Sequence, residues 1–146
     1  MKEHVLAQRA LVFGLALTFL TASVIARHAS AQGDPEAAKI KNPVASTPES
    51  IAAGKKAYDA NCAGCHGNVA QGAEKAGIVI SVIEDQGGKQ PPDLTDDKSD
   101  YGSTDGEIFM VTKKGIPPTM MAPWDGRIPD NDLWSIVNYI RSLAKK

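Results

Sequence analysis

Two cysteines and a histidine lie within five consecutive residues, Cys62-Ala63-Gly64-Cys65-His66, and form a C-x-x-C-H pattern. Two thiols at this spacing can each add to one of the two vinyl groups on one edge of a single porphyrin. The histidine after the second thiol is then held beneath the iron, where an imidazole nitrogen can be the proximal ligand. The pattern therefore predicts one covalently attached haem, held by Cys62 and Cys65 and ligated by His66.

Two other uses of a cysteine pair explain the pattern less well. A thioredoxin-like redox couple needs a βαβ setting and makes no use of the adjacent histidine. A structural zinc site needs four nitrogen or sulfur ligands, but the chain has two cysteines, and its other histidines, His4 and His28, lie near the N-terminus. A zinc site built around His66 would therefore stop at three ligands.

The sixth ligand of the predicted iron decides its function, and the methionines are the candidates. A thioether ligand gives a six-coordinate iron suited to electron transfer, whereas an open position suits gas binding or peroxide chemistry. Met110 falls inside an expected helix and is expected to pack in the core. Met120 and Met121 lie in a loop that contains three prolines and is therefore stiff. We expect the ligand to come from this pair, and the alternative is that both fill core space.

The first 31 residues have the composition of an export signal. The segment 1–9 carries basic residues, 10–26 is apolar throughout, and an A-x-A sequence ends at Ala31. This order is typical of a secretory signal peptide, which predicts cleavage after Ala31 and a periplasmic location. The alternative is an uncleaved membrane anchor, because an apolar run of 17 residues is at the short limit for a spanning helix.

The rest of the chain is interpreted as a flexible lead over 32–46 and one folded domain over 47–146. The lead is polar, contains two prolines and shows no sustained apolar period. Without residues 1–31 the chain carries 13 basic and 16 acidic side chains, a net charge of −3. Such weak acidity argues against nucleic acid as a partner.

The first helix of the domain is predicted from its start. Thr47, Pro48 and Glu49 combine an N-cap, a proline at the first helical position and an acid in the first turn, which predicts a helix toward Asn61. Gly54 lowers the helix propensity in the middle of this segment. We interpret this glycine as a point of close approach by another backbone.

Two further helices are predicted downstream. The segment 104–107 fits a capping box and opens a helix that ends before Gly115. From Asp130, apolar residues recur at the spacing i, i+3, i+4 and i+7, which predicts the last helix. These residues are Leu133, Ile136, Val137, Ile140, Leu143 and Ala144.

The segment 77–90 resists assignment. It contains a β-branched run, 77–83, and two consecutive glycines, 87–88. At this length the apolar pattern fits either a short hairpin or an irregular helical turn. The expected fold is therefore all-α, with a short hairpin or an irregular insert at 77–90.

Taken together, these elements resemble the class I monohaem c-type cytochromes of bacterial periplasms. The resemblance spans about residues 51–143 and rests on the C-x-x-C-H pattern, a downstream methionine loop and a terminal helix. The matching segments are Gly54…Tyr58, Pro92-Asp93-Leu94, 105–109, 115–124 and 132–143. The resemblance implies a small helical domain wrapped around one covalent haem c, with the first and last helices in crossed contact.

The resemblance also implies roles for particular residues. Gly54 and Tyr58 would pack against the face 134–139 of the last helix. Pro92 would orient His66 by accepting the ring N–H at its backbone carbonyl, and such contacts tune the basicity of a ligand.

The family's spacing selects one of the two adjacent methionines. Its ligand methionine usually lies six residues after a loop glycine and three before an aromatic residue. Counted from Gly115 and back from Trp124, both rules select Met121 rather than Met120. The sequence departs from the family where a proline usually follows the methionine directly, because Ala122 intervenes.

The function implied by the resemblance is that of a periplasmic one-electron carrier rather than an enzyme. It would pass electrons from a donor dehydrogenase, for example of the quinoprotein type, to a respiratory acceptor. One alternative is a haem enzyme or gas sensor with an open sixth position. Another is a non-catalytic cytochrome subunit of a larger oxidoreductase complex, tethered by residues 32–46. Contact with a membrane is expected only if the signal segment stays uncleaved.

Overall fold

The computed structural model describes residues 33–85, 88–96 and 99–144, so the predicted signal segment 1–31 lies outside the described residues. The described residues form a short 3-10 helix and six α-helices, with no strand among them. In chain order these are η1 (Ala37–Lys39), α2 (Pro48–Asn61), α3 (Ala63–His66), α4 (Ala73–Ala76), α5 (Ser81–Asp85), α6 (Asp105–Lys114) and α7 (Asp130–Leu143). None of these helices is long and apolar enough to cross a membrane.

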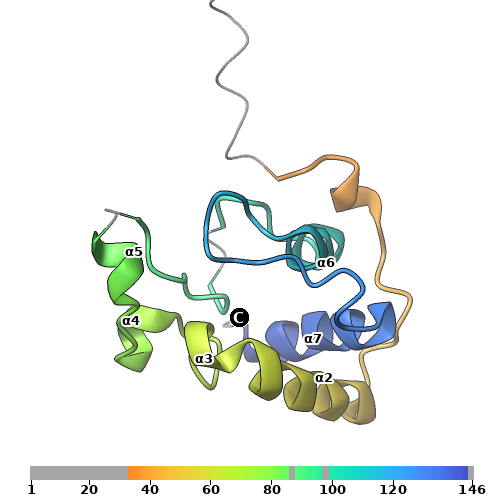
Figure 1. Cartoon of the computed structure of the whole chain (residues 1–146). Helices are drawn as coiled ribbons and strands as arrows, with labels where there is room; N and C mark the ends of the chain where they lie inside the picture. The colour runs from red at the N-terminus through yellow and green to blue at the C-terminus, as the bar shows by residue number, and fades with distance from the viewer. Residues whose placement is uncertain (1–32, 86–87, 97–98, 145–146) are drawn as a thin grey trace, which may run out of the picture. The chain divides into compact units, whose positions relative to one another are not determined.

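The helices α2 and α7 pack side by side and form the largest helix contact of the fold (Figure 1). Their backbones meet at Gly54, where a Cβ atom would lie 1.9 Å from the carbonyl oxygen of Ser135. Only a glycine permits that approach, so the predicted close contact at Gly54 is confirmed. The segment 133–140 of α7 is buried throughout, and Tyr58 of α2 is fully enclosed.

The helix α6 lies across the other side of α7 and begins as predicted. The hydroxyl of Thr104 accepts a hydrogen bond from the backbone N–H of Glu107 at 3.3 Å, and the Glu107 carboxylate accepts one from the Thr104 N–H at 2.8 Å. Phe109 of α6 stacks on Trp134 of α7 with ring centroids 3.8 Å apart. The stacking joins the two helices through their aromatic side chains.

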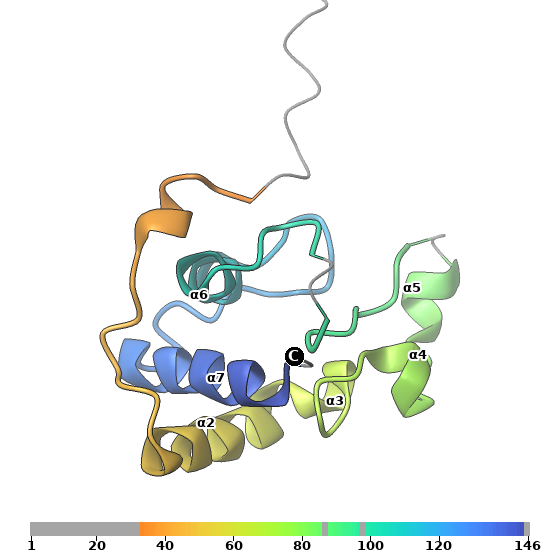
Figure 2. The same cartoon turned by 180° about the vertical axis from the view of Figure 1, so that it is seen from behind.

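The described part of the predicted flexible lead, residues 33–46, makes contacts with α6 and α7. Ala37 is buried against α6, where a Cβ on Gly106 would lie 2.0 Å from the Ala37 carbonyl oxygen. The side chain of Asn42 donates to the Trp134 carbonyl at 3.2 Å and to Asn138 Oδ1 at 2.9 Å. Figure 2 shows this segment running past α6 and α7 to the start of α2.

The short helices α4 and α5 stand apart from the group formed by α2, α6 and α7 in both views (Figures 1 and 2). Of the two alternatives for 77–90, the hairpin is wrong: the described residues contain the short helix α5 and no strand. The Gln90 side-chain amide closes the segment by bonding both the N–H and the C=O of Ile80, at 3.3 and 3.2 Å. Val79 is 67% exposed and Val82 44% exposed.

Candidate haem-binding site

The C-x-x-C-H residues lie on a single turn directly after α2. The carbonyl oxygen of Cys62 accepts hydrogen bonds from the backbone N–H groups of Cys65 and His66 at 3.1 and 3.0 Å. Residues three apart on a helix share a face, so the two cysteines lie on the same side of the turn. Neither is in a disulfide, and Cys62 is half-buried while Cys65 is exposed.

The thiol of Cys62 is in its neutral form at neutral pH. Burial, with the neighbouring Cys65 acting in the same direction, raises the pKa of Cys62 to about 11. Its surroundings therefore disfavour the charged thiolate, which is the nucleophilic form of a cysteine.

His66 ends the same turn with its ring half-buried. Its Nδ1 lies 3.4 Å from the carbonyl oxygen of Pro92, so the two residues that the resemblance pairs are in contact. Burial lowers the pKa of the His66 imidazole, while the Pro92 carbonyl acts in the opposite direction. A neutral imidazole is the form that ligates a metal, and contact of Nδ1 with Pro92 leaves Nε2 for that role.

A cavity of about 160 Å³ adjoins Pro92 and extends between α6 and α7. Its lining combines apolar side chains, namely Leu94, Ile108 and Ile140, with charged ones that include Asp93 and Arg141, and the segment 99–103 contributes further groups. Two free thiols on one face of the turn and a neutral imidazole at its end fit a covalently bound haem. Phe109, the neighbour of Ile108 on α6, is not in the lining of this cavity and stacks on Trp134 of α7.

The two adjacent methionines are held differently. The backbone N–H of Met121 donates to Thr119 Oγ1 at 3.1 Å, and its carbonyl oxygen accepts from the Ile116 N–H at 2.9 Å. The Met121 side chain is half-buried, whereas Met120 is 61% exposed. Gly115 makes the loop closure possible, because it has a φ of +68° and a Cβ there would lie 2.5 Å from the Met121 carbonyl oxygen.

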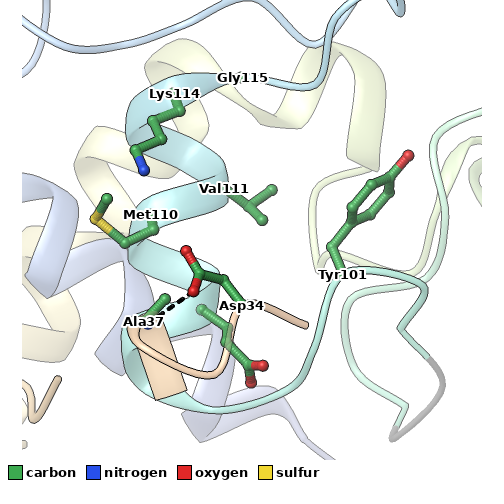
Figure 3. A pocket seen from close by; sticks show the side chains of 8 residues that line it. Asp34, Ala37, Tyr101, Met110, Val111, Lys114 and Gly115 are labelled. Carbon is green, nitrogen blue, oxygen red and sulfur yellow. Dashed lines mark hydrogen bonds between the residues drawn. The ribbon is translucent and has the colours of Figure 1, made fainter. Parts of the chain in front are cut away.

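Met110 lies in a different environment from these two. It packs against the core cluster and lines a second cavity, of about 220 Å³, between the N-terminal segment and α6 (Figure 3). The lining of this cavity comes from Asp34, Ala37, Tyr101 and α6 with Gly115 at its end. Its position agrees with the expected packing role of Met110.

Two tyrosine hydroxyls that sequence reasoning did not single out contact the chain just after His66. The Tyr58 hydroxyl donates to the Gly67 carbonyl at 2.9 Å, and the Tyr139 hydroxyl donates to the Asn68 carbonyl at 3.2 Å. The sequence does contain a signal for this, since a buried tyrosine hydroxyl generally finds a hydrogen-bond partner. The pattern cannot tell which carbonyl it finds.

Comparison with protein families decides the identity of the fold. Residues 51–144 match the model of the family described as cytochrome c. The chain belongs to the cytochrome c family. It is a monohaem c-type cytochrome with an all-α fold and a covalently bound haem c, so the sequence-based predictions of family, fold class and cofactor are confirmed.

Among curated proteins, this cytochrome c is similar to subunits of cbb3-type cytochrome c oxidases. It is 33% identical over 94 residues to subunit CcoP of Azospirillum sp. (strain B510), which covers 64% of this chain and 29% of that protein. It is 30% identical over 93 residues to subunit FixP of Bradyrhizobium sp. (strain ORS 278), which covers 64% of this chain and 27% of that protein. The chain therefore spans less than a third of the length of these relatives.

Two solved structures share the fold of this cytochrome c. Cytochrome cL from Methylophaga aminisulfidivorans has 26% identity and a TM-score of 0.53 over 66% of this chain and 55% of that chain. A chain of the reducing HAO-like protein complex of Kuenenia stuttgartiensis has 26% identity and a TM-score of 0.59 over 73% of this chain and 50% of that chain. The neighbours thus include a cytochrome described alone and a chain of a complex.

Proposed function

We propose that this cytochrome c is a periplasmic one-electron carrier whose haem is bound by Cys62 and Cys65 and ligated by His66 and Met121. The observation that carries the proposal is the α3 turn. It presents two free thiols on one face and a neutral imidazole whose Nδ1 contacts the Pro92 carbonyl. An electron carrier needs a cofactor held rigidly with little rearrangement between its two oxidation states, and this arrangement supports such a role.

Each residue of the site has a distinct task in this proposal. Cys62 and Cys65 fix the porphyrin edge through thioether bonds, and His66 gives the iron a neutral nitrogen donor. Pro92 fixes the His66 ring through Nδ1. Leu94, Ile108 and Ile140 line the adjoining cavity and would give the haem apolar contacts. The bound haem supplies the ferric–ferrous couple that accepts and releases one electron.

Met121 is proposed as the sixth ligand because hydrogen bonds fix its backbone on both its N–H and its C=O side. Its N–H and C=O are both hydrogen-bonded within the loop, and the residue is half-buried. Met120 is exposed and is the matched control for the assignment.

The first prediction tests that assignment. In protein expressed in a host that attaches haem c, the ferric wild type is expected to show the weak long-wavelength band of a thioether–iron(III) bond. Met121→Ala should abolish this band and Met120→Ala should leave it intact. The reverse result would overturn the assignment. A high-spin or hydroxide-like spectrum in the wild type would instead favour an enzyme or sensor with an open sixth position.

The proposed location and partners rest on different observations. Export is supported by the composition of residues 1–31, and determination of the N-terminus of the exported protein tests it, with Gln32 as the expected first residue. The electron donor is proposed to be a dehydrogenase, for example of the quinoprotein type, and the acceptor a respiratory protein. Failure of a reduced donor dehydrogenase to reduce the purified protein would contradict that pairing.

A second candidate function is that of a cytochrome subunit within a larger oxidoreductase complex. It is favoured by the similarity to oxidase subunits and to a chain of the Kuenenia stuttgartiensis complex. The two functions predict different native masses. A free monomer in gel filtration of the native extract supports the carrier, whereas co-elution with a large redox assembly supports the subunit.

A further inference from the structure

The loop 67–72 is hydrogen-bonded both to the His66 turn and to the segment that carries Pro92. At one end, the N–H of Gly72 donates to the carbonyl oxygen of His66 at 2.9 Å. At the other, the carbonyl oxygen of Ala70 accepts from the Leu94 N–H at 2.8 Å. The loop is therefore hydrogen-bonded to the residues on both sides of the contact between His66 Nδ1 and Pro92, and a shift of the loop changes that contact.

Gly72 brings the loop directly against Pro92. A Cβ atom on Gly72 would lie 2.9 Å from the Pro92 carbonyl carbon and 2.7 Å from the Asp93 backbone nitrogen. Gly72 also has a φ of +84°, which favours glycine. The position of the Pro92 carbonyl is therefore coupled to the position of the loop by close backbone contact.

Two tyrosines from different helices hold this loop at its first two carbonyl groups. Tyr58 of α2 donates its hydroxyl hydrogen to the Gly67 carbonyl and Tyr139 of α7 donates to the Asn68 carbonyl. Both side chains are buried, with ring centroids 5.2 Å apart. Burial also raises the pKa of Tyr58, which keeps its hydroxyl protonated and able to donate.

We infer that Tyr58 and Tyr139 are positioning residues for His66: their hydroxyl groups fix the loop 67–72 so that His66 Nδ1 stays at the Pro92 carbonyl. The inference rests on the proposed function, which makes His66 an iron ligand. A hydrogen bond from Nδ1 makes the imidazole a stronger electron donor through Nε2 and stabilises the ferric iron. The two tyrosines thus hold the reduction potential below the value that a loosely held histidine would give.

The test uses the full haem-bound protein and the variants Tyr58→Phe and Tyr139→Phe, which keep each ring and remove only the hydroxyl. Two readouts are expected to change. The exchange of the His66 Nδ1 proton with solvent, followed by NMR, becomes about tenfold faster. The midpoint potential rises by the equivalent of about a threefold change in the one-electron equilibrium constant, or roughly 30 mV at 59 mV per tenfold.

Ile136→Val is the matched control, because Ile136 packs in the same buried contact of α2 with α7. It is expected to lower stability without changing the proton exchange of His66 or the potential. If Tyr58→Phe does not fold, Tyr139→Phe gives the same readouts, since its hydroxyl lies at a partly exposed contact.

The outcomes separate this inference from the proposed function. Unchanged proton exchange and potential in the tyrosine variants that fold overturn the positioning role. Equal changes in Ile136→Val also overturn it, because they would trace to stability alone. A wild-type spectrum without the thioether band contradicts ligation by Met121, but the His66 proton exchange still decides the positioning role.

Discussion

The contact of α2 with α7 and the segment 77–90 are both rich in isoleucine and valine but differ in how far these side chains are buried. Along α7, residues 133–140 are all buried, and the helix packs against both α2 and α6. In the segment 73–90, Val79 and Val82 are exposed, and none of the described residues 77–90 belongs to the buried core cluster. Isoleucine and valine predict burial only where another element lies within reach of their face.

The difference follows from length and partners. The helix α7 spans 14 residues, so its apolar stripe extends over several turns and packs along α2. The helix α5 spans five residues and makes little more than one turn. A helix that short cannot form a continuous stripe. The four predictions below test this contrast, from the largest expected effect to the smallest.

Gly54→Ala should produce the largest loss of stability. The added Cβ would lie 1.9 Å from the Ser135 carbonyl oxygen, and neither backbone can move without separating the two helices. Overpacking of this kind costs about 3 kcal/mol of unfolding free energy, measured by urea denaturation. Helix propensity alone acts in the opposite direction, since alanine favours a helix. The exposed neighbour Ala53 provides the control, because Ala53→Gly should lose only about 1 kcal/mol. Equal stability of Gly54→Ala and the wild type would contradict the close contact.

Asn138→Ala should weaken the contact of α7 with the N-terminal segment. The Asn138 amide donates to the carbonyl oxygens of Val44 and Ala45 at 3.1 and 3.3 Å and accepts from Asn42 at 2.9 Å. Loss of these bonds leaves several partly buried polar groups without their protein partner, which costs about 2 kcal/mol. Hydrogen exchange should become faster across 33–46 while α6 stays protected. Unchanged protection of 33–46 would show that the segment is held by other contacts.

Asp93 should contribute to the free energy of unfolding in a way that is lost in acid, because it joins α4 to the segment 91–95. Burial opposes ionisation, but hydrogen bonds from Lys75 and Thr95 lower the pKa of Asp93 from 3.8 to about 2. Because the pKa is lower in the folded state, the contribution is fully present above about pH 4 and is lost as the pH falls through 2. It amounts to about 1–2 kcal/mol.

Asp93→Asn is the matched variant, and the measurement is the unfolding free energy as a function of pH. The variant should show a shallower loss of stability between pH 4 and pH 2 than the wild type. Parallel curves for the two proteins would contradict the lowered pKa of Asp93.

Val82→Ser should have the smallest effect, below about 0.5 kcal/mol, because Val82 is 44% exposed and has no place in the core. Val137→Ala is the comparison within α7, where the side chain is 1% exposed, and it should lose about 2 kcal/mol. The unfolding free energies of both variants, measured by urea denaturation, test this difference. A loss at Val82 as large as that at Val137 would mean that the segment 73–90 shares the stability of the helical core.

The features that the sequence predicted well are local ones. The starts of α2 and α6 depend on side chains within three residues of Thr47 and Thr104, and both capping boxes are present. The stripe from Leu133 to Leu143 specified α7 because its period of 3.6 is set by neighbouring turns. The role of Gly54 was also accessible, since a glycine inside a helix requires a reason that outweighs its low propensity.

The features that the sequence did not reveal join distant residues through polar groups. The hydrogen bond from Asn42 to Asn138 spans 96 positions, and no repeating apolar pattern in the sequence predicts it. The contact of Tyr139 with Asn68 spans 71 positions and depends on one hydroxyl. The contact of His66 with Pro92 was expected only through resemblance to a family, because spacing alone does not bring a carbonyl to a ring nitrogen.

The two ends of the loop that carries Met121 are held together at Lys113. The N–H groups of Trp124 and Asp125 both donate to the carbonyl oxygen of Lys113, at 3.1 and 3.0 Å, and the Lys113 ammonium binds the Asp130 carboxylate at 2.8 Å. Its two ends therefore meet at the last turn of α6, as in a compact surface loop whose ends lie close together. Such a loop can be replaced as a unit by the corresponding loop of another protein. A donor loop of another length, grafted between Lys113 and Trp124, would replace the proposed ligand Met121 while leaving α6 and α7 in place.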